Sequence, residues 1–139
     1  MRVLDIANAG VLVYAIIESS SATHALEKLL STVAAAEQEH ARSLLTQCLE
    51  GVVVQRLVPR IGGGMVAVHE ILRMQPSIQS FLLSNRMSQI AVFLKNSRDE
   101  GMMSLEHELA RLVKNQEVLP DVAQTAAVDK VLLAHLISS

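Results

Sequence analysis

Residues 49–72 read LEGVVVQRLVPRIGGGMVAVHEIL, and this stretch holds two apolar runs separated by three consecutive glycines. Valine and isoleucine dominate the runs at 52–58 and 65–71, and β-branched side chains suit the pleated, half-buried surface of a sheet. Glycine accepts the backbone angles of a tight turn, and so short a connection joins antiparallel strands only. The stretch therefore predicts a β-hairpin at the centre of the fold.

On the N-terminal side of this hairpin, residues 11–17 form a third apolar run, VLVYAII. Its length and β-branched content predict a strand that is buried on both faces. A short helix is expected before it, at 2–8, with Gly10 ending that helix. The serines at 19–21 predict an N-cap for an amphipathic helix that follows, because a serine hydroxyl accepts a hydrogen bond from a free backbone N–H. A second amphipathic helix is expected at 35–50.

On the C-terminal side the pattern becomes helical. Pro76 suits a first helical turn, and helices are expected at 76–83, 87–97 and 105–116, followed by one from Pro120 towards residue 137. Ser104 is the expected cap of the 105–116 helix. The sequence thus predicts an α/β fold with about three strands. We expect two parts, an α/β segment at 1–73 and a helical segment at 74–139.

Composition and charge exclude several classes of protein. Half of the residues are hydrophobic but only three are aromatic, so the core is expected to be aliphatic. That apolar content predicts either a dense core or a surface covered by another chain. The formal charge of −2 gives no basic field for nucleic acid. One cysteine and no apolar run of about 18 residues indicate a reducing compartment and no membrane helix. We expect a cytoplasmic protein.

Motifs for catalysis or metal binding are weak. The glycines at 62–64 precede a strand and lack a following Lys-Ser/Thr pair, so they predict a hairpin turn and no phosphate-binding loop. Glu37 and His40 have a metal-site spacing but fall on a polar helix face, and the other histidines are scattered. Cys48 lies on an apolar helix stripe, which favours a structural thiol. We predict no catalytic residue, no metal and no cofactor.

Four charged residues are candidates for a nucleotide or subunit interface. Glu18 and Glu70 each lie at the end of an apolar run. Arg56 and Arg60 flank the end of the first hairpin strand, and a guanidinium suits bidentate binding of an anion. The arginines are otherwise explained as surface charge or as an ion pair between subunits, and the functional interpretation is contact with a phosphate or a neighbouring subunit. Both interpretations stay open at this point.

Several motifs together resemble one family, the type II secretion and type IV pilus ATPases, and most closely its twitching-motility retraction ATPases. Residues 10–15 and 20–22 are similar to the strand and loop that follow the Walker B segment in that family. The stretch 49–60 resembles its LxGVxxQxLxPR segment, and 64–72 its GRVAAxEIL segment. Residues 76–78 resemble the start of its PAIRxLI helix. Residues 101–105, with Leu109, Leu112 and Val118, resemble its GMxTxDxxLxxLxxxGxI tail.

The resemblance implies the last part of a RecA-like motor domain, with an incomplete sheet, followed by a C-terminal helical bundle. Members of that family are hexameric cytoplasmic ATPases that drive pilus or secretion machinery. Their Walker A, acidic box and Walker B segments have no counterpart in these 139 residues. ATP and Mg²⁺ are therefore expected only if such segments accompany this chain.

Two departures from the family pattern bear on nucleotide binding. The family has a histidine where this chain has Val11, and another where it has Glu18. By the resemblance, Glu18 would place a carboxylate near the γ-phosphate, where like charges about 4 Å apart repel by about 4 kcal/mol at an effective dielectric of 20. We expect a non-catalytic interaction or assembly module that binds itself or an intact motor subunit. The alternative is the C-terminal portion of an active hexameric ATPase for pilus retraction or secretion.

Overall fold

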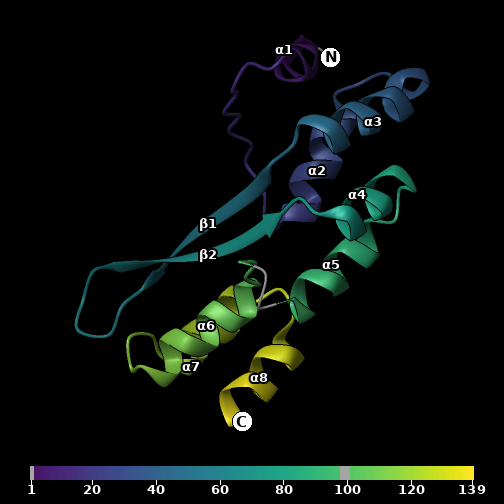
Figure 1. The fold of residues 1–139 in the computed structure, drawn as a ribbon. Coiled ribbons are helices and arrows are strands. Elements are labelled where there is room, and N and C mark those ends of the chain that lie inside the picture. Colours follow the sequence, from purple (N-terminus) through teal and green to yellow (C-terminus); the bar gives the residue numbers. More distant parts are fainter. Residues whose placement is uncertain (1, 98–100) are drawn as a thin grey trace. The chain divides into compact units, whose positions relative to one another are not determined.

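The computed structural model describes residues 2–97 and 101–139, which fold into eight α-helices, one short 3₁₀ helix and one two-stranded hairpin (Figure 1). In chain order the elements are α1 (Arg2–Asn8), α2 (Ala22–Ser31), η1 (Ala35–Glu37), α3 (Gln38–Cys48), β1 (Gly51–Pro59), β2 (Met65–Arg73), α4 (Pro76–Leu83), α5 (Met87–Asn96), α6 (Leu105–Lys114), α7 (Pro120–Ala126) and α8 (Lys130–Ser138). No helix in these ranges has both the length and the apolar character needed to cross a bilayer.

The predicted hairpin is confirmed, with its turn at the glycines. The N–H of Arg60 donates to the carbonyl of Gly64 at 3.0 Å, and all three glycines have positive φ. At the other end, the N–H of Met74 donates to the carbonyl of Glu50 at 3.0 Å. Arg60 thus lies opposite Gly64 and Glu50 opposite Met74, so the register is unbroken and places Gln55 opposite His69. Gly51 has no room for a side chain, since a Cβ there would lie 2.8 Å from the carbonyl oxygen of Leu72.

Contacts divide the chain into two compact units, one comprising residues 1–52 and 72–93 and the other residues 53–71 and 94–139. The chain crosses between them within β1, β2 and α5. This division by contacts differs from the expected segments 1–73 and 74–139. It does not test those segments, which stay a prediction.

The first unit is helical. Helix α3 contacts α1, α2 and α4, and the Gln79 side chain of α4 donates to the carbonyl of Thr46 in α3 at 3.0 Å. Ser21 caps α2 as predicted, because its hydroxyl accepts from the N–H of His24 at 3.2 Å. The buried apolar side chains of the first unit come from these four helices and from α5, and they include Leu4, Ala22, Ala25, Leu26, Leu30, Ala41, Leu44, Leu45, Ile78, Leu82 and Ile90.

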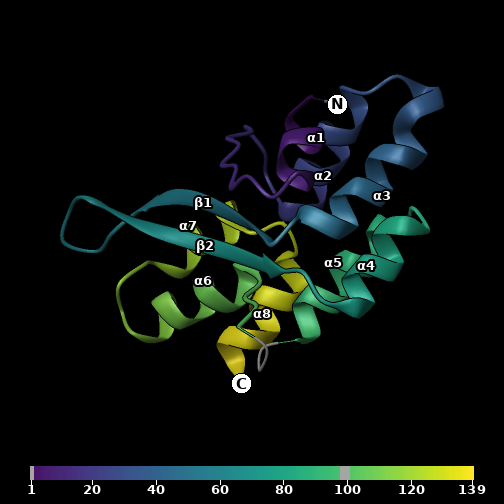
Figure 2. The same cartoon turned by 45° about the horizontal axis from the view of Figure 1, so that its top comes forward.

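The second unit packs one face of the hairpin against α6, α7 and α8, and Figure 2 shows α6 running along the strands. Side chains alternate across a strand, so the even-numbered residues of β1 and β2 face the helices. The resulting core is aliphatic, as expected, and its buried members are Val58, Val68, Leu105, Leu109, Ala110, Leu112, Val118, Ala123, Ala127 and Leu133.

The predicted strand at 11–17 is wrong. These residues, which we call the arm, belong to no sheet, and most of them are exposed. A strand exists only where neighbours pair its N–H and C=O groups, and the sheet of the described residues holds two strands in place of the expected three. The incomplete sheet is therefore smaller than predicted.

The single helix expected from Pro120 towards residue 137 is also wrong, because it is divided into α7 and α8. Ala127 has an extended backbone, with ψ of 143°, and Asp129 caps α8 by accepting from the N–H of Leu132. An aspartate that accepts from this N–H stabilises a new helix start. The break follows from that cap, and it places the start of α8 beside a carboxylate of α6, described below.

Candidate functional site

The four charged residues predicted at a nucleotide or subunit interface lie in both units. Glu18 belongs to the first unit, and Arg56, Arg60 and Glu70 belong to the second. Glu18 is exposed next to the arm, and its backbone carbonyl accepts from Lys28 Nζ at 2.9 Å. Glu70 is buried on the face of β2 that points to the helices. A buried carboxylate on this face is poorly placed to meet a ligand from solvent.

Both candidate arginines bind groups of their own unit. Arg56 is half-buried, and its Nη1 donates to the carbonyl of Ala126 at 2.7 Å. That carbonyl ends α7, where carbonyls lack partners within the helix. Arg60 Nη2 lies 3.1 Å from Glu117 Oε2, and the N–H of the neighbouring Ile61 donates to the Glu117 carbonyl at 2.9 Å. The arginines therefore bind the hairpin to the end of α7 and to the segment that follows α6.

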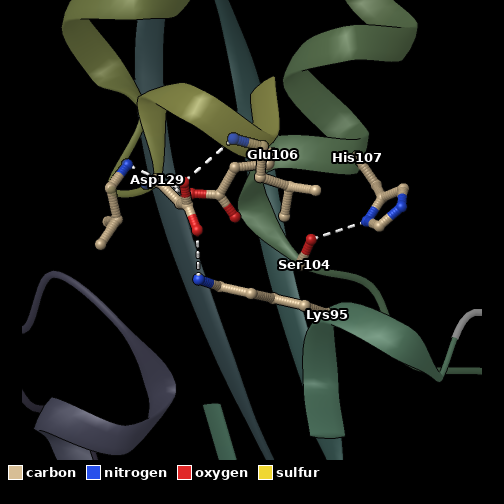
Figure 3. A network of polar contacts seen from close by, with 7 residues as sticks. Lys95, Ser104, Glu106, His107 and Asp129 are labelled. Atoms are coloured by element: carbon tan, nitrogen blue, oxygen red, sulfur yellow. Dashed lines mark hydrogen bonds and ion pairs between the residues drawn. The ribbon is translucent and has the colours of Figure 1, made fainter. Parts of the chain in front are cut away.

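A buried carboxylate forms the centre of a polar network in the second unit (Figure 3). Glu106 in α6 is 2% exposed, and its Oε1 accepts from the backbone N–H groups of Val128 at 3.2 Å and Asp129 at 2.8 Å. Asp129 in turn accepts from the N–H of Leu132 at 3.0 Å and from Lys95 Nζ at 2.7 Å. These bonds join α6, the start of α8 and the end of α5.

Both carboxylates of this network have structural partners, and those of Asp129 also affect its protonation. The N–H of Leu132 and then the ammonium of Lys95 hold the pKa of Asp129 below its usual range, so the group stays ionised. Nearby, the Ser104 hydroxyl and His107 Nδ1 are 2.8 Å apart. Ser104 occupies the predicted N-cap of α6, but its hydroxyl contacts that ring and makes no cap bond to a backbone N–H.

A second carboxylate of α6 is paired in the same unit. Arg111 binds Glu108 through two parallel bonds, Nε to Oε2 at 2.8 Å and Nη2 to Oε1 at 2.7 Å. The hydrogen bond with Arg111 lowers the pKa of the Glu108 carboxyl. A carboxylate held in this way accepts bonds and is a poor proton donor near neutral pH.

Within residues 2–97 and 101–139, no cluster of three or more histidine, cysteine or acidic side chains has a geometry that could hold a metal ion. Cys48 is a half-buried free thiol, and burial raises its pKa. A raised pKa keeps the thiol protonated, which disfavours it as a nucleophile.

The arm is the most unusual surface of the first unit. Four of its large apolar side chains are exposed: Val11 (55%), Leu12 (74%), Tyr14 (88%) and Ile16 (101%). In the described part of the chain, residues 12–17 also make no backbone hydrogen bond. Contiguous exposed apolar groups mark surfaces that contact another protein. The arm therefore combines exposed apolar side chains with backbone groups that make no hydrogen bond in the described structure.

Sequence patterns missed the polar network and the state of the arm. Asp129 stands just before an apolar run, and this cap signal was present in the sequence. Glu106 had no such signal, because its partners lie 22 and 23 residues further along the chain. The internal partners of Arg56 and Arg60 are 70 and 57 residues away, beyond the reach of any local pattern.

Comparisons with known proteins found relatives of one kind. The chain is 30% identical over 125 residues to a twitching motility protein of Neisseria gonorrhoeae, covering 89% of this chain and 33% of that protein. It is 31% identical over 110 residues to a type IV pilus retraction ATPase, PilT, of Pseudomonas aeruginosa, covering 79% of this chain and 32% of that one. The chain thus spans about a third of the length of these relatives. No protein-family model matches it.

The fold has a solved counterpart. The crystal structure of the pilus retraction motor PilT with bound ADP superposes with a TM-score of 0.82 at 23% identity, covering 95% of this chain and 38% of that one. At this identity the likeness concerns the fold. The hairpin and the helices of this chain thus have counterparts in a part of that longer chain.

Proposed function

Because this chain is homologous over most of its length to the twitching-motility and pilus retraction ATPases, we propose that it is a non-catalytic interaction module that binds an intact motor subunit of this family or a second copy of itself. The observation that carries this proposal is the arm. Its apolar side chains and its unpaired backbone groups are both exposed.

The arm has two features that suit it to bind a protein partner. An extended segment with free N–H and C=O groups can add as a strand to an exposed sheet edge, where the backbone bonds supply affinity. Apolar side chains on both sides of such a strand then enter the layers on either face of that sheet, as in buried parallel sheets. The sheet of a motor domain offers such layers, which the hairpin of this chain lacks on its exposed face.

The proposal that this chain does not hydrolyse ATP rests on its sequence and on Glu18. These 139 residues contain no Walker A motif, so no backbone loop with a lysine is available to bind a triphosphate. Glu18 is exposed and adds a negative charge next to the arm. Arg56 and Arg60, the cations considered for phosphate binding, bind groups of their own unit.

The arm is tested with Leu12→Ser combined with Ile16→Ser. Both side chains are exposed, so the fold is expected to survive. The unaltered chain should be a dimer or larger by light scattering at micromolar concentration, or should capture a full-length retraction ATPase identified by mass spectrometry. If the unaltered chain self-associates or captures the ATPase through the arm, the double variant should lose that contact. Val131→Ser in α8, an equally exposed site outside the arm, is the control and should keep it.

A monomer that captures no retraction ATPase would overturn the interaction module. Catalytic silence has a separate check. Isothermal titration calorimetry should detect no tight binding of ATP, and phosphate release should stay at background. Turnover above background by the purified chain would contradict it.

The second candidate is a part of an active hexameric ATPase, with ATP and Mg²⁺ bound by segments outside these 139 residues. The coverage of about a third of the relatives favours this candidate. A P-loop encoded upstream in the same reading frame would decide for it. In that case the arm is expected to be an inner strand of the completed sheet.

A further inference from the structure

The outer edge of β1 carries backbone groups that the hairpin does not use. In an antiparallel pair, alternate residues exchange hydrogen bonds, and the residues between them point their N–H and C=O groups outward. The bonds at Arg60 and Met74 place the even-numbered residues of β1 in the bonded positions. Val53, Gln55 and Leu57 therefore direct their backbone groups away from β2.

A bridge at the other strand supports this assignment. Ile71 of β2 lies opposite residue 53 in the hairpin register, and it exchanges hydrogen bonds of 2.8 and 3.0 Å with Met103. Ile71 therefore points its backbone groups away from β1, as the register requires for an odd-numbered residue. On the β1 side, no such bridge covers Val53, Gln55 or Leu57 within the described residues, and the backbone groups of this edge have no protein partner there.

The side chains beside this edge do not block its pairing with another strand. Val53 and Leu57 are 66% and 58% exposed on the face that points away from the helices, and Gln55 lies between them with its Oε1 3.1 Å from His69 Nε2. Natural edges are usually blunted by lysine, by proline or by a bulge. Here no lysine occurs in β1, the register has no bulge, and the only proline, Pro59, stands at its last position.

The same edge is complementary to itself. If two copies meet antiparallel about an axis at Gln55, Gln55 lies opposite Gln55 of the second copy, and Val53 lies opposite Leu57 of the second copy. All three residues are outward-pointing, so about three bonded pairs form, each exchanging two hydrogen bonds. The facing side chains are an amide pair and two apolar pairs, which carry no like charges. Arg56, the charged residue of this stretch, lies on the opposite face and binds Ala126.

We propose that the edge of β1 at 53–57 joins two copies of this chain into one continuous sheet with β1 paired to β1. This inference rests on the proposed interaction module and names a self-association surface distinct from the arm. A second copy is favoured over other partners because the edge supplies its own complement in hydrogen bonds, in apolar pairs and in charge. The contact is isologous, so it closes as a dimer and does not propagate.

A cysteine at the axis tests this contact. Gln55→Cys, made in a Cys48→Ser chain, would place two thiols on Cα atoms about 5.5 Å apart, within the range that a disulfide spans. Diamide is the oxidant and takes up two electrons and two protons as the S–S bond forms. We expect a covalent dimer to form about tenfold faster than in the control, because the paired edge raises the effective concentration of the thiols. The control is Val131→Cys in the same Cys48→Ser chain.

Gln55→Pro provides a second test without oxidation. Proline removes the outward N–H at the axis and spares the bonds within the hairpin, so circular dichroism should be unchanged. Light scattering should show a monomer where the unaltered chain is a dimer. Cross-linking of Gln55→Cys no faster than of Val131→Cys, or a Gln55→Pro chain that remains a dimer, overturns the β1 contact.

The outcomes separate this inference from the proposed function. A chain that captures the motor through its arm but does not cross-link at residue 55 keeps the proposed function and loses the β1 contact. Cross-linking should persist in the arm variant with Leu12→Ser and Ile16→Ser, because that variant leaves β1 unchanged. If cross-linking is lost in the arm variant, the arm forms the self-association surface and the β1 contact is wrong.

Discussion

The second unit and the arm use similar apolar residues with opposite results. In the second unit, β1 and β2 place Val58 and Val68 against α6–α8, where they are buried. In the arm, an equally apolar run of valine, leucine and isoleucine is exposed along most of its length. The difference lies in the neighbouring elements. The two hairpin strands pair with each other and pack against three helices of their unit, whereas the arm pairs with no strand among the described residues. An apolar run thus predicts burial only where the fold supplies a surface that covers it.

The comparison is tested most strongly by removing a leucine from each region. Leu109→Ala should cost about 2–5 kcal/mol of unfolding free energy, because its fully buried side chain leaves a cavity in the core of the second unit. Leu12→Ala should change the monomer by less than about 0.5 kcal/mol, since an exposed side chain contributes little. Urea unfolding followed by circular dichroism measures both.

A large loss of stability in Leu12→Ala would contradict the comparison. It would mean that the arm is covered by its own chain in solution. Measurement over a range of protein concentrations distinguishes this from a partner copy, because only self-association makes the loss concentration-dependent.

A smaller effect is expected from the polar network, which the arm lacks. Glu106→Ala should cost about 1–3 kcal/mol, because it leaves the N–H groups of Val128 and Asp129 without their acceptor. Glu106→Gln keeps an acceptor oxygen and should cost less. Glu27→Ala, at an exposed position of α2, is the control. If thermal unfolding shows the same loss of stability for Glu27→Ala as for Glu106→Ala, the network does not stabilise the second unit.

The smallest effect concerns the charge of Asp129. Its pKa is lowered in the folded chain, so its contribution is complete above the unfolded pKa and is lost as the pH falls through the lower folded value. Asp129→Ala should cost about 1 kcal/mol at about pH 7 as a lost N-cap, and this difference should shrink towards about pH 3. Asp129→Asn keeps a cap oxygen and should cost less at neutral pH.

Urea unfolding of the three chains at both pH values gives this comparison. A difference between the unaltered chain and Asp129→Ala that grows as the pH falls would have the wrong sign. It would show that the carboxylate is protonated in the folded chain and does not bind Lys95 as an ion.

The family relationship and the local elements were readable from the sequence. The hairpin follows from β-branched runs around a glycine turn, and the cap at Ser21 follows from one hydroxyl and a nearby N–H. The motifs at 49–60, 64–72 and 101–105 indicated the family that the comparisons confirm. Of the candidate site, the sequence supplied the identities of Arg56, Arg60, Glu18 and Glu70, and their role at an interface stays a prediction.

What the amino-acid sequence determined was therefore the set of interactions between near neighbours, because turns, caps and alternation act over a few residues. The tertiary structure alone decided that the 11–17 run joins no sheet within residues 2–97 and 101–139, that Glu106 binds the start of α8, and that Arg56 and Arg60 bind within their own unit. Each of these depends on groups far apart in the chain, and their proximity is a property of the packed fold.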